Sequence, residues 1–173
     1  MSVTPALVPR EAEPYVAATG TVTAETFPRI ADRMPVIIGW LAEHGLAPAG
    51  APFFRYRVID GERLTVDAAV PVAVAAAGGV LDGLPRGPVA DGFFVDALPA
   101  GRYATVRRVG HPDQLFAVAD AADRWAAAAG ITWDRTEGDD GVHWGARIER
   151  FHSNPMEEPD PSRWDCELAI LTA

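Results

Sequence analysis

The chain contains one sequence pattern twice. Trp40 is followed five residues later by Gly45, and Trp125 is followed five residues later by Gly130. Each pair ends an apolar run with the three- and four-residue spacing of a helix. Each run follows a short strand-like stretch and precedes two more. A strand-helix-strand-strand unit that occurs twice predicts two similar halves, and the cleft between them is a natural place for a ligand.

The first half contains a helical run whose sequence indicates a break. Apolar residues recur at helical spacing through residues 24–44, and Pro35 inside this run is expected to kink or split the helix near Met34. Asp60-Gly61-Glu62 between two apolar runs is typical of a hairpin turn. Strands of this half are expected at residues 15–22, 53–59 and 64–74.

The second half repeats this plan. A helix is expected over residues 112–129, with Gly130 as its cap, and residues 134–141 are expected to form a polar loop. Strands are expected at residues 92–97, 102–109, 142–151 and 163–171. We therefore predict a flexible lead-in and then a single domain, with the following parts: lead-in 1–13, domain 14–173, first module 14–74, linker 75–91 and second module 92–172.

Connections as short as these favour antiparallel strand pairs with helices packed on the sheet. The predicted fold class is α+β, with two strand-helix-strand-strand (SHS2) modules. We expect one antiparallel sheet with the two main helices on one face and a ligand cleft on the other.

Composition excludes several kinds of protein. The net charge of −9 disfavours non-specific nucleic-acid binding, and the single Cys166 cannot build a disulfide framework. The four histidines lack metal-ligand spacing and no dinucleotide or phosphate-loop motif occurs, so we expect no metal and no cofactor. The N-terminus lacks signal-peptide features, and the apolar stretch 68–81 is too short to span a bilayer. The expected location is the cytoplasm, without membrane binding.

An acidic residue lies among aromatic residues in the strand expected at residues 142–151. Alternation places Glu149 and Phe151 on one face, and Trp144 and Ile148 on the other. A carboxylate beside aromatic rings is the arrangement that binds a lipophilic cation. The alternative, an exposed ion pair between Glu149 and a nearby arginine, stays open.

Two further acids interrupt apolar strands, namely Asp67 and Glu167. Each is either a solvated residue at a strand edge, which is the commoner case, or part of a site. Phe54 and Tyr56 share one face of the first hairpin, where they are either pocket residues or core residues.

Four stretches of the second half resemble a known family, and one stretch of the first half resembles it more loosely. They are LPAGRYATVRRVG, ADRWAAAAGI, ARIERFHSNP and WDCELAIL, and the looser match is YRVIDGERLTVDAAVPV. In this order they resemble the GyrI-like small-molecule-binding domain, a family of effector domains from AraC-type and MerR-type multidrug regulators and standalone proteins. The resemblance implies two SHS2 modules in a pseudo-twofold arrangement, with a ligand cleft between them.

The resemblance also implies a set of site residues. Glu149 matches the buried glutamate of the penultimate strand, and Phe151 stands where family members usually carry tyrosine, so a hydroxyl role is lost there. No helix-turn-helix segment precedes residue 14, so a standalone ligand-binding domain is expected. The predicted ligand-binding residues are Phe54, Tyr56, Trp125, Glu149, Phe151, Trp164 and Glu167.

Three functions follow from these observations. The leading hypothesis is binding of bulky aromatic, often cationic small molecules without direct nucleic-acid binding. The second, which the resemblance implies for some standalone members, is hydrolysis of cyclopropane-containing natural products with Glu149 as the catalytic residue. The third is a protein-interaction role such as topoisomerase inhibition, for which the sequence identifies no partner. The sequence favours binding over catalysis.

Overall fold

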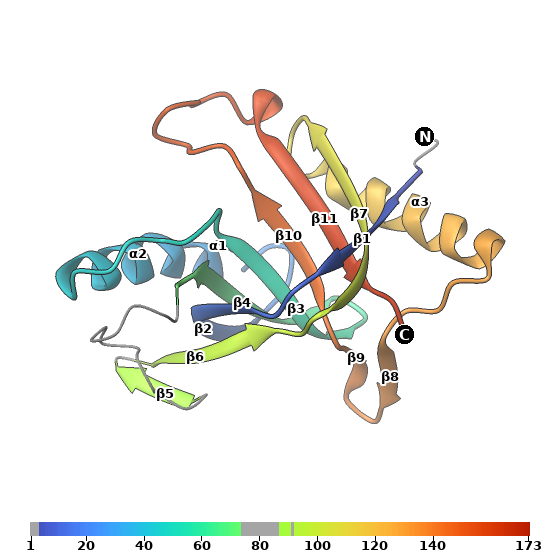
Figure 1. The fold of residues 1–173 in the computed structure, drawn as a ribbon, viewed down its shortest axis with the longest axis horizontal. Helices are drawn as coiled ribbons and strands as arrows, with labels where there is room; N and C mark the ends of the chain where they lie inside the picture. Colours follow the sequence, from blue (N-terminus) through green and yellow to red (C-terminus); the bar gives the residue numbers. More distant parts are fainter. Residues whose placement is uncertain (1–3, 74–86, 91) are drawn as a thin grey trace.

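The computed structural model describes residues 4–73, 87–90 and 92–173, which form one antiparallel sheet with helices packed on it (Figure 1). The strand order is β1-β7-β11-β10-β3-β4-β2-β6-β5, and a β8–β9 hairpin attaches to β3. The helices are α1 (Pro28–Ala31), α2 (Arg33–Glu43), α3 (Gln114–Ala129) and a 3-10 turn, Pro161–Arg163. The strands are β1 (Ala6–Arg10), β2 (Glu13–Val22), β3 (Phe53–Asp60), β4 (Arg63–Pro71), β5 (Gly87–Ala90), β6 (Phe93–Leu98), β7 (Gly101–Val109), β8 (Arg135–Gly138), β9 (Gly141–Trp144), β10 (Arg147–Phe151) and β11 (Asp165–Leu171).

Outward from the sheet centre, the strands β10, β11 and β7 on one side correspond to β3, β4 and β2 on the other, which confirms the α+β fold with two modules. Arg55 of β3 lies opposite Asp67 of β4, just as Arg150 of β10 lies opposite Glu167 of β11. This equivalence makes β3 and β10 counterparts, and they pair with each other at the middle of the sheet. The pseudo-twofold axis therefore passes between these two strands.

The helical run of the first half is divided as predicted. α1 ends before Asp32 and α2 begins at Arg33, so Pro35 is the third residue of α2. The first backbone N–H groups of a helix have no partner within it, and a proline there costs no hydrogen bond. Gly130 ends α3 with φ +67°, in the left-handed region predicted for a cap.

Three segments differ from the sequence predictions or lie outside them. Residues 6–10 are not a flexible lead-in but the edge strand β1, held by backbone pairing to β7. The loop expected at residues 134–141 contains β8 and a tight turn to β9, because polar strands at a hairpin need no apolar alternation. Most of the predicted linker 75–91 lies outside the described residues, and residues 87–90 form β5.

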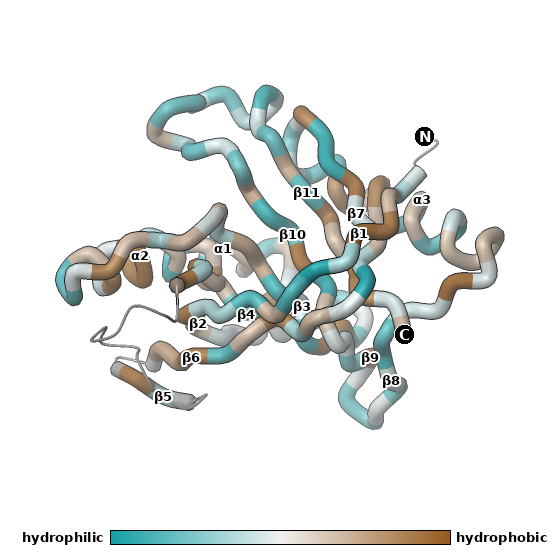
Figure 2. Tube along the Cα trace, in the orientation of Figure 1, coloured by the Kyte–Doolittle hydropathy of each residue, from teal (hydrophilic) through white to brown (hydrophobic). Residues whose placement is uncertain are grey.

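Both main helices pack on the same face of the sheet, as predicted. The apolar cluster beneath α1 and α2 and the cluster beneath α3 share Ile59 and Phe151 at their borders. A third cluster, which includes Phe53 and Ile148, fills the helix-free face. The loop between β10 and β11 and the β8–β9 hairpin are mainly hydrophilic (Figure 2). No helix in the described part of the chain is long and apolar enough to cross a membrane.

The alternation predicted across residues 142–151 is interrupted. Trp144 packs beneath α3, whereas Ile148 packs on the helix-free face, so their placement on one face is wrong. The reason is a break at Gly145 between β9 and β10, where the Gly145 N–H donates to the carbonyl of Asp134 at 2.8 Å. A side chain at position 145 would collide with Asp134, which explains the glycine.

The break also changes the side on which the candidate acid lies. Glu149 pairs with Phe54 on one side and Leu168 on the other, and both belong to the clusters beneath the helices. We expected a ligand cleft on the face away from the helices. That expectation is wrong, because the residues proposed to form the cleft lie on the other face. Glu149 and Phe151 lie on the helix-bearing face, between the two modules.

Candidate functional site

A buried carboxylate occupies the centre of the helix-bearing face. Glu149 is in the middle of β10 and is only 8 % exposed. The hydroxyl of Tyr56, on the neighbouring strand β3, donates to Glu149 Oε2 at 2.9 Å. Because Glu149 is buried, the exposed ion pair that the sequence left open is wrong.

Burial raises the pKa of Glu149, because removal from water disfavours the charged carboxylate. The hydrogen bond from Tyr56 and the positive charge of Arg147 oppose this increase without cancelling it. The Arg147 guanidinium lies 5.8 Å from the centre of the Tyr56 ring and 5.0 Å from that of Trp144. Glu149 thus takes up a proton more readily than an exposed glutamate does.

Aromatic rings surround this carboxylate. The ring centres of Phe27 and Phe54 are 5.0 Å apart, those of Phe54 and Phe151 are 5.6 Å apart, and those of Phe151 and Trp164 are 6.4 Å apart. Each of these contacts is edge-to-face, and Phe27 also stacks on Tyr56. The rings form a continuous row from the cluster beneath α1 and α2 to the cluster beneath α3.

Five of the seven predicted site residues lie together in this region, namely Phe54, Tyr56, Glu149, Phe151 and Trp164. Trp125 is half-buried and packs against the same α3 cluster as Trp164. Glu167 does not join them: it lies on the helix-free face, where Arg10 Nη2 donates to it at 2.8 Å. Sequence reasoning missed Phe27, and the signal for it is an aromatic residue immediately before the proline that begins α1.

Asp67 is not the solvated edge residue that was the commoner expectation. It is 0 % exposed, because β4 is an interior strand and the side chains of Tyr15, Thr19 and Arg57 contact its carboxylate. Thr19 Oγ1 and Arg57 Nε each donate to Asp67 at 2.6 Å. Arg57 also donates to Asp96 at 2.7 Å, so this acid belongs to a structural ion cluster on the helix-free face.

The pseudo-twofold axis explains how the candidate site is assembled. The register that makes Arg55 equivalent to Arg150 makes Phe54 equivalent to Glu149, and these two residues face each other across the axis. The same register makes Tyr56 equivalent to Phe151. The hydroxyl absent from position 151 is therefore present at the equivalent position of the other module, where it bonds to Glu149.

The Tyr56→Phe variant is expected to lower the free energy of unfolding by about 1–3 kcal/mol, because it leaves a buried carboxylate without its donor. It is also expected to raise the pKa of Glu149 further, because the hydrogen bond that wild-type Tyr56 donates stabilises the ionised carboxylate and is absent from the variant. Denaturant unfolding and a carbon-13 NMR titration of the Glu149 carboxyl measure both effects. Tyr103→Phe, which removes a hydroxyl bonded to the Pro99 carbonyl, is the matched control. An unchanged Glu149 pKa in Tyr56→Phe contradicts the interaction.

No family model matches the chain, and no curated protein matches it by sequence. Solved structures match its fold. EcmrR in a DNA complex has a TM-score of 0.71 at 14 % identity, and the match covers 96 % of this chain and 56 % of that chain. This chain therefore spans little more than half the length of that protein. The separately solved C-terminal domain of EcmrR has a TM-score of 0.69 at 14 % identity, covering 97 % of this chain and 96 % of that domain.

Two other similar structures are a ligand complex and a hydrolase. SAV2435, solved with bound tetraphenylphosphonium, has a TM-score of 0.58 at 9 % identity, covering 99 % of this chain and 94 % of that chain. A hydrolase from Listeria innocua has a TM-score of 0.59 at 8 % identity, covering 99 % of this chain and 93 % of that chain. These likenesses show the fold that the resemblance to the GyrI-like domain predicted.

Proposed function

We propose, on the premise that the chain has a GyrI-like fold, that it binds bulky aromatic small molecules that carry a positive charge. The observation that carries this proposal is the buried Glu149 carboxylate within a row of aromatic rings on the pseudo-twofold axis. Ring faces attract cations, and a carboxylate removed from water pairs with a cation more strongly than an exposed one does. A neutral hydrophobic ligand gains only the first kind of contact, so Glu149 would select for charge.

The similar structures support this class of ligand. SAV2435 binds tetraphenylphosphonium, a lipophilic cation made of four aromatic rings around one positive charge. The same fold in this chain combines a buried carboxylate with Phe54, Phe151 and Trp164, which suits a ligand of that chemistry.

Phe54, Tyr56 and Glu149 are each at most 8 % exposed in this structure, so a ligand reaches Glu149 only if one of the rings moves. Phe151 is fixed in a central strand, and the Trp164 indole donates from Nε1 to the carbonyl of Glu158 at 2.8 Å. Phe27 is half-buried at the start of the four-residue helix α1, whose N-terminal residue makes no side-chain capping bond. Phe27 is therefore the ring that a ligand would displace, which exposes Tyr56 and then Glu149.

The test compares wild type with Glu149→Gln, a variant that keeps the shape of the side chain and removes its charge. Titration with tetraphenylphosphonium and with a cationic rhodamine is expected to show affinity that is about 10- to 100-fold lower for the variant, equal to about 1.4–2.8 kcal/mol. Neutral triphenylphosphine oxide is the matched ligand, and it is expected to bind both proteins alike. Equal affinity of both proteins for the cations would show that Glu149 has no charge role.

Hydrolysis of an electrophilic small molecule is the second candidate function. It is favoured by the raised pKa of Glu149 and by the adjacent Tyr56 hydroxyl, because a carboxyl group whose pKa is raised holds a proton more readily and can exchange it with a reacting group. Glu149 would remove a proton from water as the water oxygen attacks one carbon of the strained ring. The ring C–C bond at that carbon would break, and Glu149 would return the proton to the carbon that leaves with the electron pair. Mass spectrometry would detect the hydrated product with wild type and not with Glu149→Gln. Absence of product across a panel of such compounds leaves binding alone.

A further inference from the structure

An arginine close to Glu149 has aromatic neighbours and no acidic partner. The Arg147 guanidinium lies 5.8 Å from the centre of the Tyr56 ring and 5.0 Å from that of Trp144. The chain has 24 acidic residues against 15 basic ones, yet no carboxylate in the described part of it forms an ion pair with Arg147. The side chain is partly exposed, so its guanidinium has donors available for an acceptor on a ligand.

The tryptophan beside Arg147 adds a second donor and a second positive charge. Trp144 is 7 % exposed, and both its Nε1 and the Nε of Arg147 are buried without a hydrogen-bond partner among the described residues. Buried donors without an acceptor are rare in folded proteins. The Arg135 guanidinium lies 5.2 Å from the centre of the same indole ring. Two guanidinium groups and an unpaired N–H around one ring favour an anionic group, because a carboxylate accepts from donors of both kinds.

This positive region lies beside the negative one. Arg147 and Glu149 are two residues apart on β10, so their side chains leave the same face of the strand about 7 Å apart. The charge of Arg147 reaches Glu149, since it lowers the pKa of that carboxyl group in opposition to burial. A ligand that has only a positive charge is therefore attracted by Glu149 and repelled by Arg147. A ligand with both charges is attracted at both ends.

We propose that the ligand of this site is an aromatic zwitterion, whose cationic group pairs with Glu149 and whose carboxylate pairs with Arg147. This inference rests on the proposed function and adds a second charged group to the ligand. A planar guanidinium matches the two oxygens of a carboxylate and donates to both of them. The contacts with Tyr56 and Trp144 orient the guanidinium before the ligand binds, which lowers the cost of ordering it.

Two dyes with the same ring system provide the test. At neutral pH rhodamine B has a cationic ring system and a carboxylate, whereas its ethyl ester has the cation alone. Wild type is expected to bind rhodamine B about tenfold more tightly than the ester. Arg147→Met, which keeps an apolar side chain against the rings, is expected to lose this preference. Arg147→Lys is expected to keep part of it, because lysine retains the charge and lacks the planar fork.

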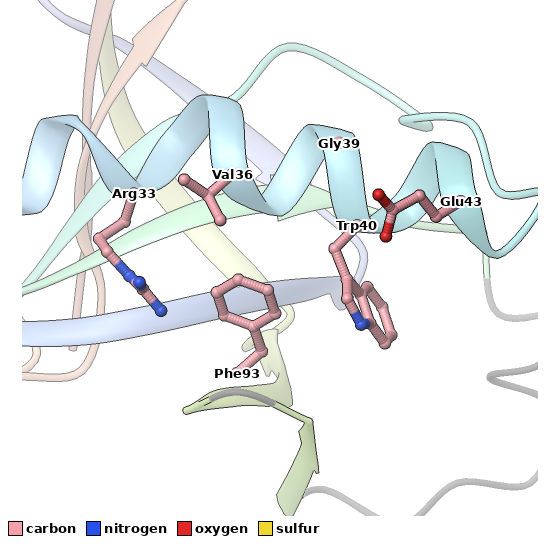
Figure 3. Close-up of a pocket in the computed structure, with 6 residues that line it drawn as sticks. All are labelled: Arg33, Val36, Gly39, Trp40, Glu43 and Phe93. Carbon is pink, nitrogen blue, oxygen red and sulfur yellow. The ribbon is translucent and has the colours of Figure 1, made fainter.

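Arg33→Met is the matched control, because Arg33 also contacts an aromatic ring. Figure 3 shows Arg33 beside Phe93 in the groove between α2 and β6, where its guanidinium lies 5.0 Å from the ring centre. Glu149 does not line this groove, so Arg33→Met is expected to keep the preference for rhodamine B. Glu149→Gln is expected to weaken the binding of both dyes alike, which also keeps the preference. Circular dichroism checks that each variant is folded.

Equal affinity of wild type for the two dyes would overturn the proposal, and so would failure of wild type to bind either dye. An equal loss of affinity for both dyes in Arg147→Met would overturn it as well, because such a loss reflects packing alone. The proposed function has a separate outcome, since it fails when Glu149→Gln binds the ester as tightly as wild type does. In that case, a preference for rhodamine B that disappears in Arg147→Met would still show that Arg147 binds a carboxylate.

Discussion

Replacing Asp67 with alanine is expected to lower the free energy of unfolding by about 3 kcal/mol. Asp67 is fully buried and accepts short hydrogen bonds from Thr19 and Arg57, so its loss leaves donors without an acceptor inside the protein. Removing one partner of a buried ion pair costs about 3–5 kcal/mol. We expect the lower end of that range because Arg57 is partly exposed and keeps its bond to Asp96.

Denaturant unfolding measures this loss, and Asp165→Ala is its control. Asp165 also pairs with an arginine, Arg107, but both side chains of that pair reach solvent. Exposed pairs contribute at most about 1 kcal/mol, so the control variant is expected to lose far less stability. Similar losses at positions 67 and 165 would contradict the structural role of the buried cluster.

Below the pKa of Glu149, binding of a permanently charged ligand is expected to weaken by up to about tenfold for each pH unit, until the affinity reaches that of Glu149→Gln. The ionised carboxylate attracts the cation, whereas the protonated form offers no charge. Burial raises the pKa of Glu149, so the decline begins at a higher pH than it would with an exposed glutamate. Titration of wild type with tetraphenylphosphonium across the acidic range measures the effect. Glu149→Gln is expected to show a flat profile, and a flat profile in wild type would contradict the role of this group.

Protonation of Glu149 is expected to stabilise the folded protein, although it weakens the binding of a cation. A carboxyl group whose pKa is raised by folding binds its proton more tightly in the folded state than in the unfolded state. Its contribution to stability is fully present below the unfolded pKa and is lost as the pH rises through the folded pKa. The difference in melting temperature, Glu149→Gln minus wild type, should therefore become more positive as the pH rises. Thermal unfolding of both proteins at several pH values measures this difference.

Local features of this fold could be predicted from the sequence, because they depend on neighbouring residues. The spacing of apolar residues located both main helices, and Pro35 predicted the division between α1 and α2. The Asp-Gly turn predicted the hairpin of β3 and β4. The edge strand β1 was missed because its apolar residues are largely exposed and its stability comes from backbone pairing to β7.

The faces of the sheet depend on contacts between distant strands, and here sequence reasoning failed in part. Alternation holds only within an unbroken strand, and the break at Gly145 reverses which side the preceding residues occupy. Glu167 was placed with Glu149, yet the register pairs Glu149 with Leu168 and leaves Glu167 on the other face. Five of the residues proposed for the site nevertheless lie together, and they were chosen because their residue types matched a family pattern rather than a calculated geometry.

The position of Glu149 on the pseudo-twofold axis has a consequence for the history of this architecture. In a symmetric dimer of a single module, whatever residue occupies this position also occupies its counterpart across the axis. Two glutamates would then stand as direct neighbours on paired strands, where like charges repel. Joining the two modules in one chain lets Phe54 take one position and Glu149 the other. A single negative charge on the axis thus requires two modules of different sequence, and this chain supplies both of them.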